Sequence, residues 1–400
     1  MTIRILHIIH RPQRRGAEMF AIRLAEHLQQ SGVYDNAICS LFEQPAGSPD
    51  DFPHSLKSYQ LRVKPGWWES SAHFTPLVFA RLSRVLRQYR PDIVIAHGSK
   101  TLKYASLSKL MYRRSKTIYK NIGTASFWAN TPARVRFGRL MLRNMDAVVS
   151  VSDFTRTDFI DLYKFQSDRA IFIANAVDVT EFQKLDAAAA RAEVRKEIGL
   201  PDSETLIVNV GSLSPGKGQE ELIDLVSDLP RHGMHPHLAL VGAGPTRQDL
   251  ERRAVTRGVL DRVHFMGLRR DIPKVLSSGD IFVLTSATEG MPGVLIEAGL
   301  AGLASVAYSV GGVREVIVDG ITGRTAAFGD HAALTRAVCE IAESSETRAR
   351  MGASARRRCM ELFDIREVSA RYQSLFEILL KSRSKRETGA RMARLTGGPS

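Results

Sequence analysis

The sequence contains little cysteine, and its few cysteines form no recognisable set. Its 400 residues include Cys39, Cys339 and Cys359, an odd number without the short spacings typical of metal sites. Disulfide frameworks belong mainly to small secreted domains, so this sparse set argues against one. We therefore expect a protein that works in a reducing compartment, the cytoplasm.

Long apolar runs are also missing. No stretch approaches the roughly 18 uninterrupted apolar residues that indicate a transmembrane helix. Residues 1–9 form a short apolar run with no small-residue cleavage site, which favours a first strand over a signal peptide. We expect a soluble protein, or one that contacts a membrane only at its surface.

Three nucleotide-binding motifs are absent as well. The segment 210–218, VGSLSPGKG, lacks the spacing of a Walker phosphate loop. The segment 241–245, VGAGP, is followed by Arg247 where a dinucleotide fingerprint has its third glycine. Asp-x-Asp occurs nowhere, which weakens the case for a metal ion on a diphosphate. These absences argue against a nicotinamide-dependent oxidoreductase, and no nucleic-acid-binding motif is present.

Positive charge is concentrated in the first half of the chain. Residues 1–175 hold 26 Lys and Arg against 13 Asp and Glu, and the formal net charge of the whole is +14. This asymmetry indicates an anionic surface partner, such as an acidic lipid leaflet or a phosphate-bearing acceptor, with a solvated face as the alternative. The basic stretches 81–90 and 100–116, and Trp67-Trp68, are candidates for peripheral membrane contact; ordinary surface packing is the alternative.

Strand-like and helix-like segments alternate along two successive parts of the chain. Such alternation predicts parallel, doubly wound sheets, so we expect an α/β fold of two Rossmann-like domains facing a central cleft that binds ligands. The expected parts are domains at 1–180 and 181–360, a helix at 361–380 packing back toward the first domain, and a basic disordered tail at 381–400. The expected strands are 3–9, 92–96, 117–121, 147–151, 170–174, 206–210, 238–241, 263–265, 281–284 and 305–307.

The most informative segment is 285–302, TSATEGMPGVLIEAGLAG. A strand ends in small polar residues, and Pro292 then suits the first turn of a helix. A helix N-terminus at the carboxyl end of a strand can bind a diphosphate through its free N–H groups. Glu289 and Glu297 could each bond a different hydroxylated part of one ligand, or serve as a helix cap and a surface residue.

Further candidates lie in other strand-to-helix loops. Lys217 stands beside a predicted helix start, where its charge would add to the helix dipole and suit phosphate; a plain surface lysine is the alternative. Gly242 allows a tight turn, and Gly311-Gly312 is expected to turn close to the crevice. Gly16, preceded by Arg14-Arg15, would let a ligand approach the first domain.

Taken together, these blocks resemble the retaining glycosyltransferases of family 4, which have the GT-B fold. Glu289 and Glu297 match the Glu-x7-Glu motif of that family. The resemblance covers roughly residues 1–375 and is strongest from 205 to 330. Other matching blocks, in order, are 151–159 (VSDFTRTDF), 174–182 (ANAVDVTEF), 241–245 (VGAGP), 263–267 (VHFMG) and 311–323 (GGVREVIVDGITG).

The resemblance implies roles for individual residues. Lys217 would neutralise the donor diphosphate, Glu289 would bind donor-sugar hydroxyls, and Glu297 would hold the ribose. Arg269 would lie near the base, and Gly16 would approach the donor from the acceptor-binding first domain. The remaining implied donor contacts are Gly211, Ser212, Gly242, Gly290, and the backbone around Met291, Pro292, Gly293 and Val294.

Three positions depart from the family pattern. Ser212 stands where an arginine is usual, and Arg15-Gly16 stands where the family usually has two glycines. Asn121 occupies the place of a frequent histidine, which leaves His97 as the nearest candidate for an active-site histidine. These changes put one phosphate contact and the histidine assignment in question.

The resemblance implies a retaining sugar transfer from a nucleotide-sugar to a saccharide or lipid-linked acceptor in polysaccharide, lipopolysaccharide or glycolipid synthesis. The leaving phosphate would take the proton of the acceptor, so we expect no metal, no cofactor and no dedicated protein base. The enzyme would work in the cytoplasm, at the inner face of the membrane where the basic first domain meets anionic lipid. The alternative is a weak or inactive GT-B protein that binds sugar nucleotide or polysaccharide.

Overall fold

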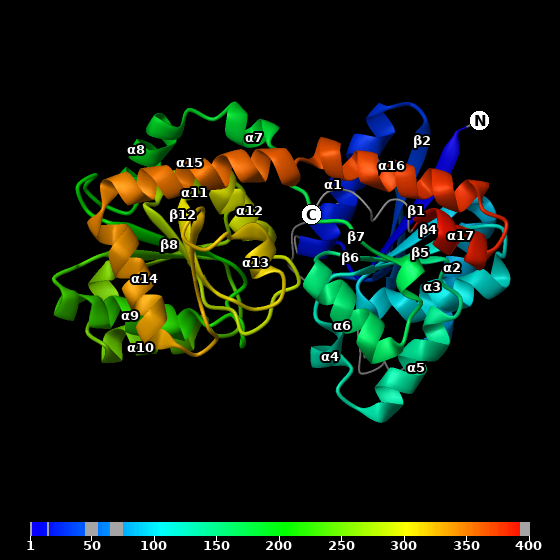
Figure 1. Ribbon diagram of the computed structural model, residues 1–400, viewed down its shortest axis with the longest axis horizontal. Coiled ribbons are helices and arrows are strands. Elements are labelled where there is room, and N and C mark those ends of the chain that lie inside the picture. Colours follow the sequence, from blue (N-terminus) through cyan, green and yellow to red (C-terminus); the bar gives the residue numbers. More distant parts are fainter. Residues whose placement is uncertain (1, 14–15, 45–54, 65–74, 393–400) are drawn as a thin grey trace. The chain divides into compact units, whose positions relative to one another are not determined.

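The chain forms two compact units, shown in Figure 1 as a computed structural model. The structure describes residues 2–13, 16–44, 55–64 and 75–392. Unit 1 comprises residues 1–176 and 365–400, and unit 2 comprises residues 177–364. Both are α/β units built on parallel sheets, as the alternation predicts.

Unit 1 is built on a parallel sheet with the strand order β3-β2-β1-β4-β5-β6-β7. Its strands are almost continuously apolar because helices cover both faces of a parallel sheet; β1, for example, reads IRILHII and is buried along most of its length. The strands are β1 (Ile3–Ile9), β2 (Tyr34–Phe42), β3 (Lys57–Val63), β4 (Ile93–His97), β5 (Lys116–Asn121), β6 (Ala147–Ser150) and β7 (Ala170–Phe172).

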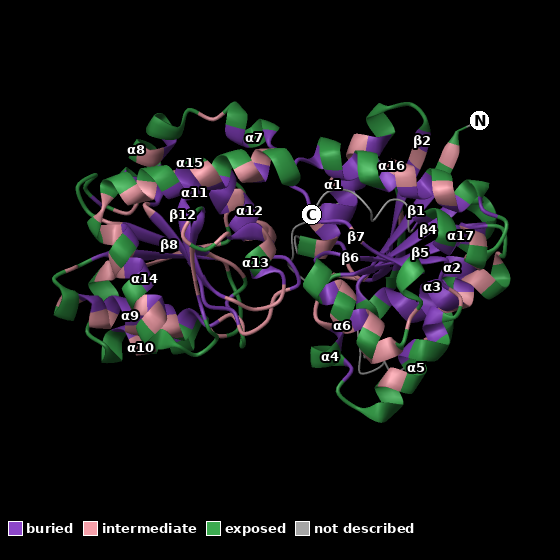
Figure 2. Ribbon diagram, viewed as in Figure 1, coloured by how far each residue is buried: buried purple, intermediate pink, exposed green. Residues whose placement is uncertain are grey.

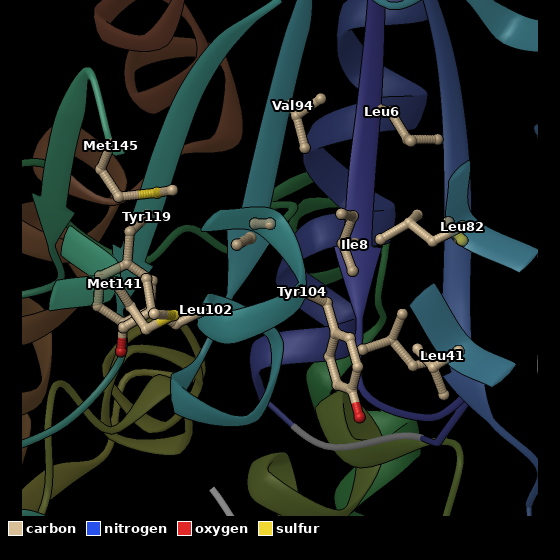
Figure 3. Packing of buried hydrophobic residues seen from close by; sticks show 14 of the residues in the cluster. Leu6, Ile8, Leu41, Leu82, Val94, Leu102, Tyr104, Tyr119, Met141 and Met145 are labelled. Carbon is tan, nitrogen blue, oxygen red and sulfur yellow. The ribbon is translucent and has the colours of Figure 1, made fainter. Parts of the chain in front are cut away.

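Two apolar cores lie on the two faces of this sheet. One contains Leu6, Val94 and Tyr119 together with side chains of α2, α3 and α5 (Figure 3). The other lies beneath α1 and α16 and contains Phe20 and Tyr372. The helices of unit 1 are α1 (Gly16–Gln30), α2 (Pro76–Tyr89), α3 (Ser99–Met111), α4 (Ala125–Trp128), α5 (Pro132–Leu142), α6 (Asp153–Tyr163), η2 (Ser167–Arg169), α16 (Ile365–Lys381) and α17 (Lys385–Met392).

The end of the chain returns to unit 1 as two helices. Residues of α16 pack against α1, and Lys116 donates to the carbonyl of Ser382 with an Nζ–O distance of 2.7 Å. The prediction of disorder from residue 381 onward is wrong for 385–392. These residues form α17, which buries Thr388 and Met392, and residues 393–400 lie outside the described part.

Unit 2 has a parallel sheet with the order β10-β9-β8-β11-β12-β13, buried between its helices (Figure 2). Its strands are β8 (Leu206–Val210), β9 (His237–Val241), β10 (Val263–Gly267), β11 (Ile281–Leu284), β12 (Ala304–Tyr308) and β13 (Gly323–Ala326). Its helices are α7 (Thr180–Gln183), α8 (Ala187–Glu197), α9 (Gln219–Asp228), η3 (Leu229–His232), α10 (Arg247–Thr256), η4 (Leu260–Arg262), α11 (Ile272–Ser278), α12 (Gly293–Leu300), α13 (Val313–Val316), α14 (His331–Glu343) and α15 (Ser345–Leu362).

In each sheet the strand order reverses at one point. The chain runs from β1 outward to β3 and then crosses back to β4 on the other side of β1; in unit 2 it does the same between β8 and β11. Because the loops leaving the two strands diverge there, a crevice opens at their carboxyl ends, and ligands of open α/β sheets bind at such switch points. The loops after β1, β4, β8 and β11 are therefore the places to look for a site.

Three strands and one surface differ from the sequence expectations. Strands β2, β3 and β13 were not predicted. The basic stretch 100–116 was proposed as a surface helix, but α3 packs between α2 and α5 and buries Lys103. That helix is therefore unsuited to lie on a membrane, while Trp67-Trp68 lie outside the described residues.

Candidate functional site

The switch point of unit 2 brings two of the predicted residues together. Lys217, in the loop after β8, and Glu289, in the loop after β11, form an ion pair with an Nζ–Oε1 distance of 2.7 Å. Their side chains are 33% and 13% exposed, so the pair is reachable from solvent. This arrangement offers a cation and a carboxylate side by side at the carboxyl edge of the sheet.

Backbone contacts hold the loops around this pair in place. The N–H of Ala287 donates to the carbonyl of Gly216 at 2.9 Å, and the hydroxyl of Thr285 donates to that of Gly218 at 2.8 Å. Gly311 has a φ of 54°, and a Cβ there would lie 1.6 Å from the carbonyl oxygen of Glu289. Only glycine fits this approach, so the loop after β12 braces the backbone of Glu289.

The N-terminus of α12 lies directly after Glu289 in the chain. Pro292 is the N-cap, and its side chain makes no capping hydrogen bond to the first turn. Gly290, Met291 and Pro292 are buried, whereas Gly293 and Val294 are half-buried. The amides of Gly293 and Val294 are thus the ones suited to an anion. Glu297 lies one turn further along α12 than Gly293 and is also half-buried.

Three other predicted donor contacts, Gly211, Ser212 and Gly242, lie where the loops after β8 and β9 pack against each other. Gly242 has a φ of 143°, and a Cβ there would lie 1.9 Å from the carbonyl oxygen of Gly211. The carbonyl of Ser212 accepts from Nε2 of Gln219 at 3.0 Å, and its exposed hydroxyl lies 3.0 Å from that of Ser214. The need for Gly242 is therefore explained by the fold without a ligand.

Arg269 follows β10 and is already bound to carboxylates. Its Nε lies 2.9 Å from Asp271, and its guanidinium also bonds Glu197 at 2.5 Å. These bonds raise the pKa of Arg269 above its ordinary value. The bond to Glu197 ties the loop after β10 to α8. Because two carboxylates already neutralise its charge, the guanidinium of Arg269 would attract a nucleotide phosphate less strongly than an unpaired arginine would.

The switch point of unit 1 holds a pair of buried histidines. Nε2 of His97, the last residue of β4, lies 3.1 Å from Nδ1 of His7, and Nε2 of His7 lies 3.2 Å from Oδ1 of Asn36. Because the Asn36 oxygen can only accept, His7 carries its proton on Nε2 and accepts from His97 at Nδ1. Nδ1 of His97 is then an unprotonated acceptor, without a partner among the described residues.

Burial keeps both rings neutral. It lowers the pKa of His7 to about 4 and lowers the pKa of His97 well below its ordinary value. Loss of solvation is the largest cause of both shifts. Of the predicted residues of unit 1, His97 thus lies at the switch point. Gly16 is the first residue of α1, and a Cβ added there would meet no described atom within 4 Å. Arg14 and Arg15 lie outside the described residues.

Lys120 is a buried amine that no sequence motif marks as a site residue. Its Nζ lies 3.1 Å from Oδ1 of Asn175 and 2.8 Å from the ring centre of Phe20. Burial lowers its pKa well below the ordinary value. The next residue, Asn121, is also buried, and its amide donates to the hydroxyl of Ser150 and the carbonyl of Thr155. Asn121, which stands where the family often has a histidine, is thus hydrogen-bonded within unit 1.

Among the described residues, no group of three or more His, Cys, Asp or Glu side chains is arranged to hold a metal ion. The switch point of unit 2 presents a cation, Lys217, and the carboxylate of Glu289, followed along the chain by the N-terminal amides of α12 and by Glu297. Such a set suits an anionic ligand that also carries hydroxyl groups.

Two family profiles match successive parts of the chain. The profile described as Glycosyltransferase Family 4 matches residues 14–181, and the one described as Glycosyl transferases group 1 matches residues 190–358. An alpha-D-kanosaminyltransferase of Streptomyces kanamyceticus is 29% identical over 71% of this chain and 68% of its own length. A lipopolysaccharide core biosynthesis glycosyltransferase, LpsD of Rhizobium meliloti, is 24% identical over 94% of this chain and 98% of its own.

Solved structures share the fold over nearly the whole chain. Anabaena HepE, in complex with UDP and glucose, superposes with a TM-score of 0.80 at 20% identity, covering 94% of this chain and 99% of its own. WaaG, a glycosyltransferase involved in lipopolysaccharide biosynthesis, gives a TM-score of 0.74 at 18% identity, covering 92% and 99%. These likenesses identify the fold as GT-B.

Proposed function

Because the chain belongs to glycosyltransferase family 4 and is a glycosyltransferase, we propose that it transfers a sugar, with retention, from a nucleotide-sugar to a saccharide or lipid-linked acceptor. The product would belong to a polysaccharide, a lipopolysaccharide or a glycolipid. The names of relatives support this range: LpsD is named for lipopolysaccharide core biosynthesis, and a mannosyltransferase of Mycolicibacterium smegmatis, 28% identical over 78% of this chain and 82% of its own, is named for phosphatidylinositol monomannoside. The UDP and glucose bound by HepE support a nucleotide-sugar donor.

The observation that carries the proposal is the ion pair of Lys217 and Glu289 beside the open amides of α12. A donor diphosphate would draw Lys217 away from Glu289 and accept bonds from the amides of Gly293 and Val294. The carboxylate of Glu289 would then be available to the hydroxyls of the donor sugar, and Glu297 to the ribose. The cation and amides stabilise the charge that develops on the leaving nucleoside diphosphate.

Retention requires the acceptor oxygen to attack the face that the phosphate leaves. The bond between the anomeric carbon and the phosphate oxygen breaks, the bond to the acceptor oxygen forms, and the proton of the acceptor passes to the leaving phosphate. These reaction steps need neither a metal ion nor a dedicated protein base. His97 is the candidate histidine of unit 1, and its neutral Nδ1 can accept a hydrogen bond.

The second candidate is a GT-B protein that binds sugar nucleotide or polysaccharide with little or no catalysis. Two observations favour it: Ser212 replaces a usual arginine, and Asn121 is a buried structural residue where the family often has histidine. The intact ion pair of Lys217 and Glu289 favours catalysis.

The proposed place of work is the cytoplasm, with unit 1 toward the inner face of the membrane. Among the residues that the structure describes, no helix is long and apolar enough to cross a membrane. The basic charge of residues 1–175 supports a peripheral contact with anionic lipid.

The test has two steps. Thermal stabilisation by UDP, GDP and ADP identifies the nucleotide, since a ligand raises stability by mass action. The matching nucleotide-sugar is then supplied with candidate acceptors, and release of nucleoside diphosphate is measured for the wild type, Glu289→Gln and Glu340→Gln. Glu340 is the matched control, because it pairs with Arg324 in the same unit but away from the switch point.

We expect Glu289→Gln to lose at least about 100-fold in turnover, as removal of a transition-state contact does, and Glu340→Gln to retain the wild-type rate. An unchanged rate in Glu289→Gln would show that the site is elsewhere. Tight nucleotide binding without turnover, across acceptors, would favour the non-catalytic candidate.

A further inference from the structure

Two helices of unit 1 carry exposed apolar side chains, three of them aromatic. Phe127 and Trp128 on α4 are 52% and 61% exposed, and Phe137 and Leu140 on α5 are 39% and 51% exposed. In Figure 1 these helices lie at one end of unit 1, and in Figure 2 both carry the colour of exposed residues. Phe127 and Trp128 contact each other with ring centroids 5.0 Å apart, and Arg134 of α5 donates to the carbonyl of Trp128. Single exposed apolar residues are ordinary, whereas several on two consecutive helices are typical of a binding surface.

The internal packing of unit 1 does not use this outer face. The inner face of α5 serves the core, where Gly138, Met141 and Leu142 are buried. Likewise, α4 buries Ala125 and leaves its two aromatic side chains outside. The fold therefore gives no reason for aromatic side chains at these outward positions.

The segment that carries these side chains is strongly basic in sequence, although α6, which packs against both helices, contributes Asp153, Asp158 and Asp161. Of these, Asp153 pairs with Arg156 and Asp158 accepts from the N–H of Ser126. Residues 93–145 contain 11 Lys and Arg and no Asp or Glu. On α5, Arg136 lies one residue before Phe137, and Arg143 lies three residues after Leu140. Among the described residues, no carboxylate pairs with Arg136 or Arg143, and both are exposed. Their charge is thus available to an anionic partner.

We propose that Phe127, Trp128, Phe137, Leu140, Arg136 and Arg143, here called the α4–α5 surface, bind an anionic phospholipid bilayer. Aromatic and aliphatic side chains would enter the headgroup region, as they do in interfacial helices, while the arginines meet lipid phosphates. Exposed apolar side chains, with arginines beside them on α5 that pair with no described carboxylate, are complementary to such a bilayer. The use of this contact rests on the proposed function, since it brings the enzyme to a lipid-linked acceptor.

This surface replaces the one expected from sequence. The stretch 100–116 has the right composition, but α3 is largely buried. The segment 125–143 has fewer basic residues, yet the fold leaves Phe127, Trp128, Phe137 and Leu140 exposed.

The test is sedimentation of the purified full chain with vesicles, without donor or acceptor, so that it is independent of transferase activity. The vesicles are phosphatidylcholine alone, or phosphatidylcholine mixed with phosphatidylglycerol. We expect binding to the mixed vesicles, weakening at high salt because surface charges are screened. Equal binding to both kinds of vesicle, or to neither, would overturn the proposal.

Variants then locate the contact. Phe127→Ser with Trp128→Ser should abolish most binding, and Arg136→Gln with Arg143→Gln should weaken it by about fivefold per arginine. The matched controls lie in unit 2: Phe328→Ser, an exposed aromatic, and Arg356→Gln with Arg357→Gln, an exposed arginine pair. Both controls should bind as the wild type does. Unchanged binding in the surface variants, despite wild-type thermal unfolding, would refute the assignment.

A second measurement reports insertion directly. With Trp67 and Trp68 replaced by Phe, Trp128 is the single tryptophan of the chain. Its emission should shift to shorter wavelength with anionic vesicles, because the ring leaves water. An unshifted emission, or a dimer in sedimentation that Phe127→Ser with Trp128→Ser converts to monomer, would overturn the bilayer as occupant.

Discussion

Units 1 and 2 have sheets in which the strand order reverses in the same way, but the side chains at the two switch points are charged in unit 2 and neutral in unit 1. Where β8 and β11 diverge, Lys217 and Glu289 form a charged pair open to solvent. Where β1 and β4 diverge, His7 and His97 form a buried pair that is kept neutral. One topology can therefore present a charged pair in one unit and an uncharged hydrogen-bonding pair in the other.

The buried cations of the two units differ in the same way. In unit 2, Arg195 bonds Asp280 with an NH2–Oδ2 distance of 2.6 Å and donates to the carbonyls of Ser278 and Pro201. In unit 1, Lys120 has an amide partner, Asn175, and no carboxylate partner among the described residues. Burial favours the neutral form of Lys120, whereas the pair with Asp280 compensates the charge of Arg195.

The largest expected effect follows from this difference. Arg195→Met leaves Asp280 with less compensation and several carbonyls without a donor, so it should lower the free energy of unfolding by about 3–5 kcal/mol. Lys120→Met removes an uncompensated amine and should leave that free energy equal or higher. Urea unfolding with hydrogen exchange resolved by unit measures both.

The Lys120 variant also carries a pH signature. The folded pKa lies well below the ordinary 10.5, so the unfolded chain binds the proton more readily. Stability from the neutral amine is therefore lost as pH falls below about 10. The advantage of Lys120→Met over the wild type should shrink as pH rises toward that value. A loss of stability in Lys120→Met comparable to that in Arg195→Met would show that the two cations are equally compensated.

The second prediction separates the two lysines by activity. Lys217→Met should lower kcat by about 100- to 1000-fold, the effect of removing a group that stabilises the leaving charge. Lys120→Met should change kcat only slightly, because its amine is buried under Phe20. Steady-state release of nucleoside diphosphate measures both, and similar losses in the two variants would break the contrast between the units.

The sequence predicted the charged switch point better than the neutral one. Lys217 and Glu289 stand in glycine- and proline-rich loops directly after apolar strands, where a site is expected. His7 and His97 are 90 residues apart, and only the pairing of β1 with β4 brings them together. Their proton arrangement depends on Asn36, from β2, a strand that the sequence pattern does not predict.

The missed features share a cause: long-range packing outweighs local pattern. Strand β3 reads KSYQLRV, and its alternation was a usable signal. Strand β13 reads GRTA and has no apolar run; it forms because β12 offers a free edge. Lys120 and Arg195 are cations, which composition assigns to the surface, and the partner of Arg195 is 85 residues away. Phe127 and Trp128 were not singled out, since nothing local predicts that they stay exposed.

The third prediction concerns acid. The unfolded pKa of a histidine is near 6.5, and that of His7 in the fold is about 4. Because the folded state favours the neutral ring, its contribution is complete above about pH 6.5 and is lost as pH falls toward 4. Between about pH 7 and pH 5, His7 alone should cost unit 1 about 2 kcal/mol.

The comparison for this acid effect is a histidine pair in unit 2. Nδ1 of His237 lies 3.0 Å from Nε2 of His264, and burial lowers both pKa values, but the rings are only partly buried. Hydrogen exchange at both pH values should therefore show unit 1 losing more protection than unit 2. His7→Gln should reduce the loss in unit 1, and equal losses in both units would contradict the assignment of the neutral pair.

The smallest expected effect concerns position 212, where the charged site of unit 2 lacks its usual arginine. Ser212 is exposed, and its hydroxyl lies within hydrogen-bond distance of that of Ser214, so an arginine can replace it without disturbing the core. In Ser212→Arg, a second cation near Lys217 should tighten binding of the matching nucleoside diphosphate by about fivefold, a gain of about 1 kcal/mol. Calorimetric titration measures it, with Ser203→Arg as the control for added charge. If Ser203→Arg tightens binding equally, the gain is a general effect of net charge. A gain confined to Ser212→Arg means that the loop after β8 faces the diphosphate, as expected if the charged pair of unit 2 binds it.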